Sequence, residues 1–250
     1  MQRITLRLAA LACALFLTMD LSFVYGQVTA ISVETVAIHD GPVGNSDLTG
    51  MTTYRLYADL TSPDDFVGAV YGSAAEPIDI SSTTSFFQHP AGGSFGTDLN
   101  LFFLTILPDL NYDSWLTIGS ESTLDEDVSS IGMGAAFDAF NNGEGFVLNP
   151  PAGGSWYVTP NSNPAAMAGE DGRVLVGQFT VTDDASGEPG DISGLWNMQW
   201  RQGGSSTMEN RELYFTTGTY MPPLDGCTDE TACNYNPMAT DDDGSCLQND

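Results

Sequence analysis

Short runs in which apolar and polar residues alternate recur between residues 27 and 220. In Thr53–Leu60 the even positions are apolar or aromatic, whereas the odd positions include Arg55 and Asp59. Successive side chains of a strand point to opposite faces of a sheet, so this period of two predicts strands with one buried face. The same pattern predicts strands at 28–38, 65–71, 84–88, 100–106, 114–119, 155–158, 173–182, 195–201 and 211–217.

Turn-forming residues separate these runs, and helical patterns are rare. Pro-Gly, Gly-Gly, Asn-Gly and Asn-Pro breaks lie between the predicted strands. Only 131–140 and 164–167 have the character of one or two helical turns. Many short strands without alternating helices predict an all-β fold, an antiparallel β-sandwich over residues 27–220. An immunoglobulin-like and a jelly-roll arrangement are both compatible with the pattern.

Residues 1–26 are typical of a secretory signal peptide. Arg3 and Arg7 form a positive start, an apolar run follows over 8–19, and Gly26 is a small residue at the predicted cleavage site. A membrane anchor is the alternative, but a spanning helix needs about 20 apolar residues and the run stops at Asp20. We therefore expect a secreted or cell-surface protein with no transmembrane segment in its mature chain.

The mature chain is strongly acidic. Without Arg3, Arg7 and Asp20 of the predicted signal peptide, it keeps 4 basic and 32 acidic residues, a formal charge of −28. Such a field repels phosphate backbones and anionic lipid, which argues against nucleic acid as a partner. It attracts divalent cations, although adaptation to a salty environment explains the total charge equally well. Local clusters of acidic residues therefore have to carry any argument for a cation site.

Composition changes after a short linker at residues 221–226. The segment 227–250, called here the C-terminal module, is poor in apolar residues and holds Cys227, Cys233 and Cys246. A segment this small usually needs disulfides or a metal to keep a shape. A bridge between Cys227 and Cys246 would close a loop of about 20 residues, which stabilises the fold by roughly 3 kcal/mol. Three is an odd number, so either one thiol stays reduced or its partner lies outside this chain.

Oxygen-bearing side chains crowd the C-terminal module. Calcium takes six to eight oxygen ligands, and clustered carboxylates repel one another unless a cation lies among them. Gly244 after the acidic run permits a sharp turn around such an ion. A solvated acidic loop held by a disulfide alone is the alternative. The candidate calcium ligands here are Asp229, Asn234, Asp241 and Asp243.

A second cation candidate is the alternating set Asp109, Asn111 and Asp113. Its oxygens could wrap calcium in a loop before a strand. It is not an EF-hand, because Ser114 replaces the required glycine and Ser120 replaces the bidentate glutamate. Asp and Asn also form Asx turns without any metal, which is the alternative interpretation.

The strings GCTD, ACNYNP and DDGSC over residues 226–246 resemble a Cys- and Asp-rich repeat of secreted and surface proteins of environmental bacteria. This repeat is distantly similar to the calcium-binding repeats of thrombospondin type 3. The resemblance implies calcium binding and a surface location. Many copies carry a fourth cysteine where this chain has Asp241, which leaves Cys233 without that partner. Since such repeats often continue in tandem, we expect this chain to be an amino-terminal piece whose Cys233 pairs downstream.

Evidence for catalysis is weak. Gly92–Gly96 matches the hydrolase string G-x-S-x-G, but that motif needs a strand-turn-helix and a later histidine, and His39 and His89 both precede it. Two histidines make no convincing zinc site. Acid pairs for glycoside hydrolysis are uninformative among 32 acids. A set of aromatic residues has two interpretations: its side chains line a sugar-binding platform, or they belong to the buried core. The set is Trp115, Trp156, Tyr157, Trp196, Trp200 and Tyr214.

These observations predict a non-enzymatic, secreted structural or adhesive protein with a calcium-stabilised C-terminal module. Its expected partners are divalent cations and extracellular glycans or surface proteins. The alternative is a carbohydrate-binding module or the ancillary domain of a polysaccharide-degrading enzyme. An acid-pair hydrolase is the third interpretation.

Overall fold

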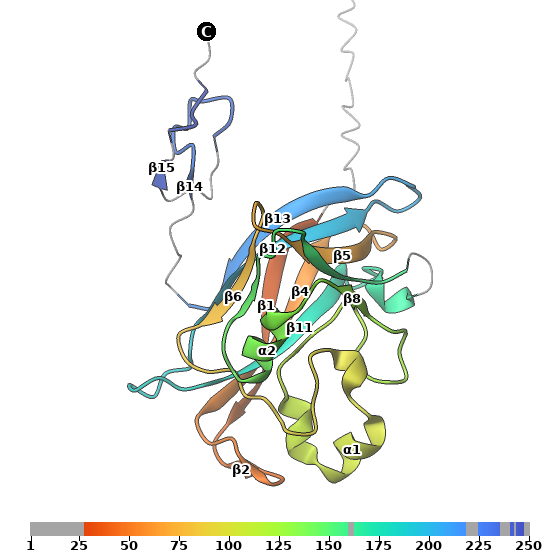
Figure 1. Ribbon diagram of the computed structural model, residues 1–250, viewed down its shortest axis with the longest axis vertical. Coiled ribbons are helices and arrows are strands. Elements are labelled where there is room, and N and C mark those ends of the chain that lie inside the picture. Colours follow the sequence, from red (N-terminus) through yellow and green to blue (C-terminus); the bar gives the residue numbers. More distant parts are fainter. Residues whose placement is uncertain (1–27, 160–162, 219–224, 236–240, 243, 248–250) are drawn as a thin grey trace, which may run out of the picture.

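The computed structural model describes residues 28–159, 163–218, 225–235, 241–242 and 244–247 (Figure 1). The predicted signal peptide and most of the predicted linker lie outside these residues, as does Asp243. No helix within the described ranges is long and apolar enough to cross a membrane.

A four-stranded antiparallel sheet, the first sheet, forms one layer. Its order is β1-β4-β11-β7, with bounds β1 Val28–His39, β4 Met51–Leu60, β11 Arg173–Thr182 and β7 Trp115–Leu116. On β4 the predicted even-numbered face is buried at Leu56, Ala58 and Leu60. The long strands predicted here are confirmed.

A seven-stranded sheet, the second sheet, forms the other layer. Strand β12 is its centre, because β13 pairs with one edge and β5 and β6 share the other. Beyond that shared edge, β10 and then β8 follow β5, and β9 follows β6. The bounds are β5 Phe66–Gly72, β6 Ile78–Ser82, β8 Ser129–Ile131, β9 Phe146–Leu148, β10 Gly154–Tyr157, β12 Ile192–Arg201 and β13 Glu209–Thr216.

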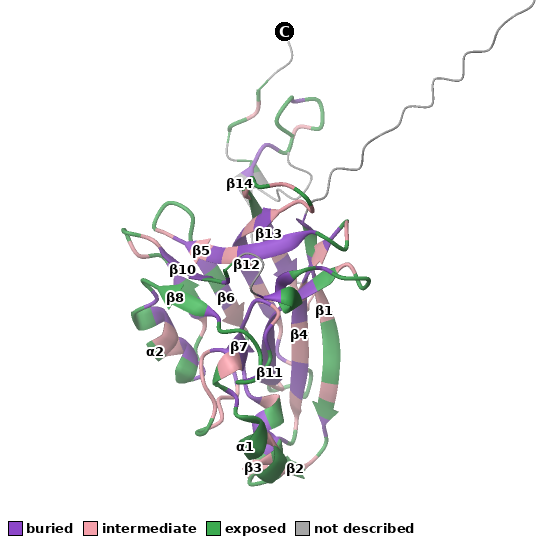
Figure 2. Cartoon of the chain, turned by 90° about the vertical axis from the view of Figure 1, so that its right-hand side faces the viewer, coloured by how far each residue is buried: buried purple, intermediate pink, exposed green. Residues whose placement is uncertain are grey.

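Short elements complete the chain. Two small two-stranded sheets pair β2 with β3 in antiparallel fashion and β14 with β15 in parallel fashion. In both ribbon views α1 and the β2–β3 pair lie at the same end of the sandwich (Figures 1 and 2). The bounds are β2 Pro42–Val43, β3 Ser46–Asp47, η1 Gly96–Asp98, α1 Leu101–Ile106, η2 Pro108–Tyr112, α2 Ala135–Asn141, η3 Pro164–Ala166, β14 Asp225–Gly226 and β15 Asp241–Asp242.

The core lies between the two sheets and closes through aromatic edge contacts. Phe179 of the first sheet touches Phe140 of α2, with ring centroids 6.0 Å apart. Phe140 touches Phe146 of the second sheet, whose ring lies 5.6 Å from that of Trp156. Trp156 in turn contacts Trp196. Since edge-to-face pairs stabilise beyond their buried area, this chain of rings holds the sandwich together, and the predicted β-sandwich is confirmed.

Two predicted strands are wrong, and a third is shorter than predicted. Residues 101–106 of the predicted strand 100–106 form helix α1, since the Asn100 side chain accepts a hydrogen bond from the Phe102 amide, 2.9 Å away, and caps the first turn. A short continuous apolar run cannot be assigned to strand or helix by periodicity alone. Residues 84–88 contribute one isolated bridge at Phe86, and 114–119 form a strand only at Trp115–Leu116. The predicted helical turns occur as α2 and η3.

Candidate functional site

The C-terminal module is closed by a disulfide between Cys227 and Cys246, as the sequence predicts. Cys233 lies outside this bridge and is exposed. Among the module residues whose burial the structure describes, only Cys227 and Ala232 are buried. Because this small amount of buried apolar surface contributes only weakly to stability, the covalent bridge and polar contacts give the module its shape.

Two of the candidate calcium ligands in the module bond to its own chain. The Asn234 amide donates to the Ser245 carbonyl over 2.8 Å, and its oxygen accepts from the Leu247 amide over 2.7 Å. Asp229 accepts from both the amide and the hydroxyl of Thr231. Asn234 thus joins the two halves of the loop, and Asp229 closes a local turn.

Asp241 and Asp242 of the acidic run form the strand β15. Its parallel register sets Asp225 opposite Asp241 and Gly226 opposite Asp242. The Asp242 carboxylate accepts from the Gly244 amide over 3.1 Å, and Gly244 has a φ of 75°, the left-handed conformation that glycine tolerates best. Within the described part of the chain no group of three or more His, Cys, Asp or Glu residues is arranged to hold a metal ion. Calcium in the module stays a prediction.

Asp109 of the second cation candidate is buried among hydrogen-bond donors. One of its oxygens, Oδ2, accepts from the Ser46 hydroxyl at 2.7 Å and the Asn45 amide at 3.3 Å, and it lies 3.4 Å from His89 Nε2. Burial by itself would raise the pKa of Asp109, but the Ser46 hydrogen bond, together with His89 and the backbone amides, lowers it below the ordinary value. This carboxylate therefore ties the β2–β3 turn to η2.

Asp113 ties down a different loop. Its carboxylate accepts from the His89 amide at 2.7 Å and from the Gly93 amide at 3.3 Å. Burial raises the pKa of Asp113 to about 7, although these amides and that of Ser114 act in the opposite direction.

Asn111, the middle member, uses its side-chain amide to donate to the carbonyls of Leu104 and Pro108. The partners of all three side chains thus lie in different segments, and those of the two carboxylates are donors. A calcium ion needs oxygen acceptors instead, so calcium at Asp109, Asn111 and Asp113 stays a prediction without support from this geometry.

The glycine-rich string over 92–96 lies in a loop after His89. Ser94 donates its hydroxyl to the Asn141 side chain over 3.1 Å. Nδ1 of His89 accepts from the Ala91 amide, so the neutral ring carries its proton on Nε2, facing Asp109. A hollow of about 360 Å³ lies over this loop, and two of its polar lining side chains, His89 and Asn141, already have partners within the chain.

The aromatic set does not form an exposed platform. All four tryptophans are at most 3 % exposed and belong to the core. Tyr157, at 40 % exposed, is the large aromatic of this set that reaches solvent most. The carbohydrate-binding alternative therefore loses the stacking surface that the sequence suggested for it.

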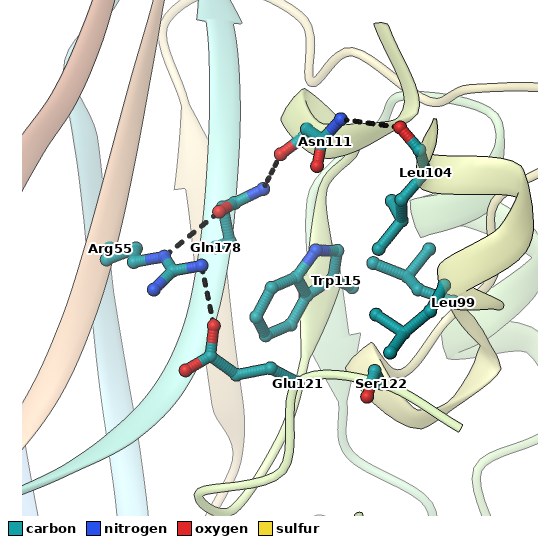
Figure 3. Close-up of a pocket in the computed structure, with 9 residues that line it drawn as sticks. Arg55, Leu99, Leu104, Asn111, Trp115, Glu121, Ser122 and Gln178 are labelled. Carbon is teal, nitrogen blue, oxygen red and sulfur yellow. Dashed lines mark hydrogen bonds and ion pairs between the residues drawn. The ribbon is translucent and has the colours of Figure 1, made fainter. Parts of the chain in front are cut away.

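A pocket of about 190 Å³ lies beside Trp115, where the first sheet meets α1 (Figure 3). Arg55 of β4 donates from Nε to the Gln178 side chain at 3.1 Å and pairs with Glu121 at 2.7 Å. The Arg55 guanidinium lies 5.9 Å from the centroid of the Trp115 ring. The pocket is lined by Arg55, Leu99, Leu101, Leu104, Asn111, Trp115, Glu121, Ser122 and Gln178.

The position of Gln178 is fixed from two sides. Its amide nitrogen donates to the carbonyls of Asn111 and Asp113, each 2.9 Å away, while its oxygen accepts from Arg55. Sequence reasoning missed this pocket because its apolar wall includes α1, which was predicted as a strand. The one available signal was Arg55, one of only 4 basic residues in the predicted mature chain.

Comparison of the chain with protein-family models, with curated proteins and with solved structures finds no match. The function is therefore argued from the residues themselves.

Proposed function

We propose that this chain is a secreted or cell-surface protein with a structural or adhesive role, and that its C-terminal module binds calcium. The observation that carries the proposal is the disulfide between Cys227 and Cys246, which encloses an acidic loop whose described residues include almost no buried apolar side chain. Disulfides of this kind belong to oxidising compartments, and small coreless segments use bridges and metals in place of a core.

Calcium would act on the repulsion within the module. The β14–β15 register sets the backbone of Asp225 opposite that of Asp241, the first of three consecutive aspartates in the sequence. Neutralising part of this charge would stabilise the closed form, since only the folded module presents these residues together. A rigid sandwich followed by a calcium-stiffened module would suit a protein that bears or transmits mechanical load outside the cell.

The test is calorimetric titration of the intact mature chain with calcium, with magnesium as the comparison ion. The double variant Asp241→Asn/Asp243→Asn removes two candidate ligand charges, and we expect it to bind calcium at least about tenfold more weakly. The matched control is Asp183→Asn/Asp184→Asn, which removes the same charge from a loop of the sandwich.

Equal affinities in the two double variants would show that any binding reflects net charge alone, and the calcium proposal would fail. The structural role has a separate test, because calcium should also protect the amides of residues 227–247 from hydrogen exchange. Binding without such protection would argue against a stiffening role.

A further inference from the structure

Helix α1 presents large apolar side chains to solvent. None of its six residues is buried. Leu101, Phe102, Phe103 and Ile106 are between 42 % and 67 % exposed, and Figure 2 shows the helix at one end of the sandwich with exposed residues on its surface. Single exposed apolar residues are normal on any protein, whereas several on one element indicate a surface that binds a partner.

The loop at residues 121–127 adjoins this helix. The Thr123 amide donates to the carbonyl of Leu99, two residues before α1, over 3.1 Å. Leu124, the next residue of the loop, is 78 % exposed. Helix and loop also share in lining the pocket beside Trp115. The apolar residues of the two segments are called here the docking surface: Leu101, Phe102, Phe103, Ile106 and Leu124.

The docking surface is held in one shape by the residues beneath it. Leu104 of α1 packs against the apolar cluster that includes Trp115, and the Asn100 side chain caps the first turn of the helix. In the loop, the Asp125 carboxylate accepts from the Glu121 amide over 2.8 Å. A surface that is already ordered loses little conformational entropy when a partner binds.

The charge of the loop restricts which partner fits. Glu121, Asp125, Glu126 and Asp127 are all exposed, and Arg55 pairs with the first of them at 2.7 Å. A second copy of this chain would bring an equally acidic loop against this one, and anionic lipid would be repelled in the same way. The complementary surface is apolar where it meets α1 and positively charged where it meets the loop.

We propose that the docking surface binds a partner protein through a segment whose apolar side chains are flanked by arginine or lysine. The apolar side chains cover α1 and Leu124 and supply most of the affinity, while the basic ones face the carboxylates of the loop and orient the segment. The docking surface contains no residue of the C-terminal module, so this inference is independent of calcium binding.

The test measures the binding of fluorescent peptides to the intact mature chain by fluorescence anisotropy, at physiological salt and with a chelator that removes calcium. The probe is an amphipathic peptide of leucine and lysine. One comparison peptide replaces every leucine by serine, and another replaces every lysine by glutamate. We expect the leucine–lysine peptide to bind at least about tenfold more tightly than either of them, because it alone matches both the apolar and the acidic part of the surface.

A pair of matched variants locates the apolar contact. Phe102→Ser/Ile106→Ser should weaken binding of the leucine–lysine peptide at least about tenfold, since two central apolar contacts are lost. Ile38→Ser/Ile131→Ser removes two apolar side chains from β1 and β8 and should leave binding unchanged. All four side chains are more than half exposed, so both variants should keep the melting temperature of the parent chain.

A second pair locates the charged contact. Glu126→Gln/Asp127→Asn should weaken binding of the leucine–lysine peptide about threefold, as expected for two exposed charge pairs. Asp183→Asn/Asp184→Asn removes the same charge from another loop of the sandwich and should have no such effect.

Four results would overturn the proposal. The first is equal affinity for the leucine–lysine and serine–lysine peptides, which would reduce binding to net charge. The second is equal affinity of the two serine double variants for the leucine–lysine peptide. The third is binding of the parent chain to neutral phosphatidylcholine vesicles that Phe102→Ser/Ile106→Ser abolishes, which would assign the surface to lipid. The fourth is a dimer, seen by analytical ultracentrifugation, that the same variant dissociates.

Discussion

Trp156 and Trp196 are two core tryptophans that differ in one respect. Both are 0 % exposed, and their ring centroids lie 5.8 Å apart, although their strands β10 and β12 lie on either side of β5 in the second sheet. The Trp156 indole N–H donates to the Thr117 carbonyl over 3.2 Å, whereas that of Trp196 has no acceptor within the described residues. Substituting each by phenylalanine removes similar apolar volume but a different polar contribution.

The expected loss of stability follows from these two terms. Removing one ring of the indole lowers the free energy of unfolding by about 2 kcal/mol through lost burial and the cavity left behind. Trp156→Phe also loses a hydrogen bond worth about 1 kcal/mol, for a total of about 3 kcal/mol. Trp196→Phe instead removes an unpaired buried donor and recovers about 1–2 kcal/mol, so its net loss is only about 0–1 kcal/mol.

Urea unfolding of the mature chain measures both values by linear extrapolation. The slopes should match between the variants, because the surface exposed on unfolding is nearly the same. Circular dichroism in the far ultraviolet suits the assay, since neither substitution changes the strands that it reports. Equal losses for the two variants, or a larger loss for Trp196→Phe, would refute the assignment of hydrogen bonds in this core.

Three further predictions concern a buried acid, the disulfide and a glycine. Because the pKa of Asp113 is raised, the folded protein keeps a proton on this carboxyl that the unfolded chain releases near pH 4. The contribution of Asp113 to the free energy of unfolding therefore falls by up to about 4 kcal/mol as pH rises from about 4 to about 7. Asp113→Asn should flatten this pH dependence, measured by urea titrations at several pH values. Reducing Cys227–Cys246 should remove about 3 kcal/mol of loop-closure stabilisation from the C-terminal module alone, seen as lost amide protection there with an unchanged melting temperature of the sandwich. Gly119→Ala should lower the free energy of unfolding by at least about 2 kcal/mol more than Gly187→Ala does. Both glycines have φ near 80°, but only at Gly119 would the new Cβ lie 2.1 Å from a backbone oxygen, that of Ala165. Equal melting temperatures of the two variants would contradict this prediction.

The sequence predicts best those strands in which apolar and polar residues alternate over many positions. The segments 53–60 and 173–182 both show period two, and the structure pairs them through β4 and β11. The prediction failed at 100–106, where four consecutive apolar residues carry no periodic signal. There the Asn100 cap decides for a helix, and four large side chains of α1, Leu101, Phe102, Phe103 and Ile106, are left exposed.

The candidate ligands Asp109 and Asp113 show why spacing alone misled the assignment of a cation site. Alternating Asp and Asn residues in a loop are the sequence pattern both of a set of calcium ligands and of side chains that accept hydrogen bonds from nearby backbone amides. The difference lies in what surrounds the carboxylates. Ser46 and His89, which come from distant parts of the chain, supply donors to them, and no local pattern could reveal those partners.

Sequence by itself determined the class of this protein: period-two runs between turns lead to a β-sandwich, and two cysteines around an acidic segment lead to a disulfide-closed module. Those features are local, because strand formation and loop closure depend on residues near one another along the chain. Only the tertiary structure decided which tryptophans are buried, what Asp109 and Asp113 bind, and that Arg55, Glu121 and Trp115 share a pocket. Some of these contacts join residues more than 60 positions apart, such as Arg55 with Glu121 and Ser46 with Asp109. Their energies depend on burial and distances that exist only after the sheets have packed.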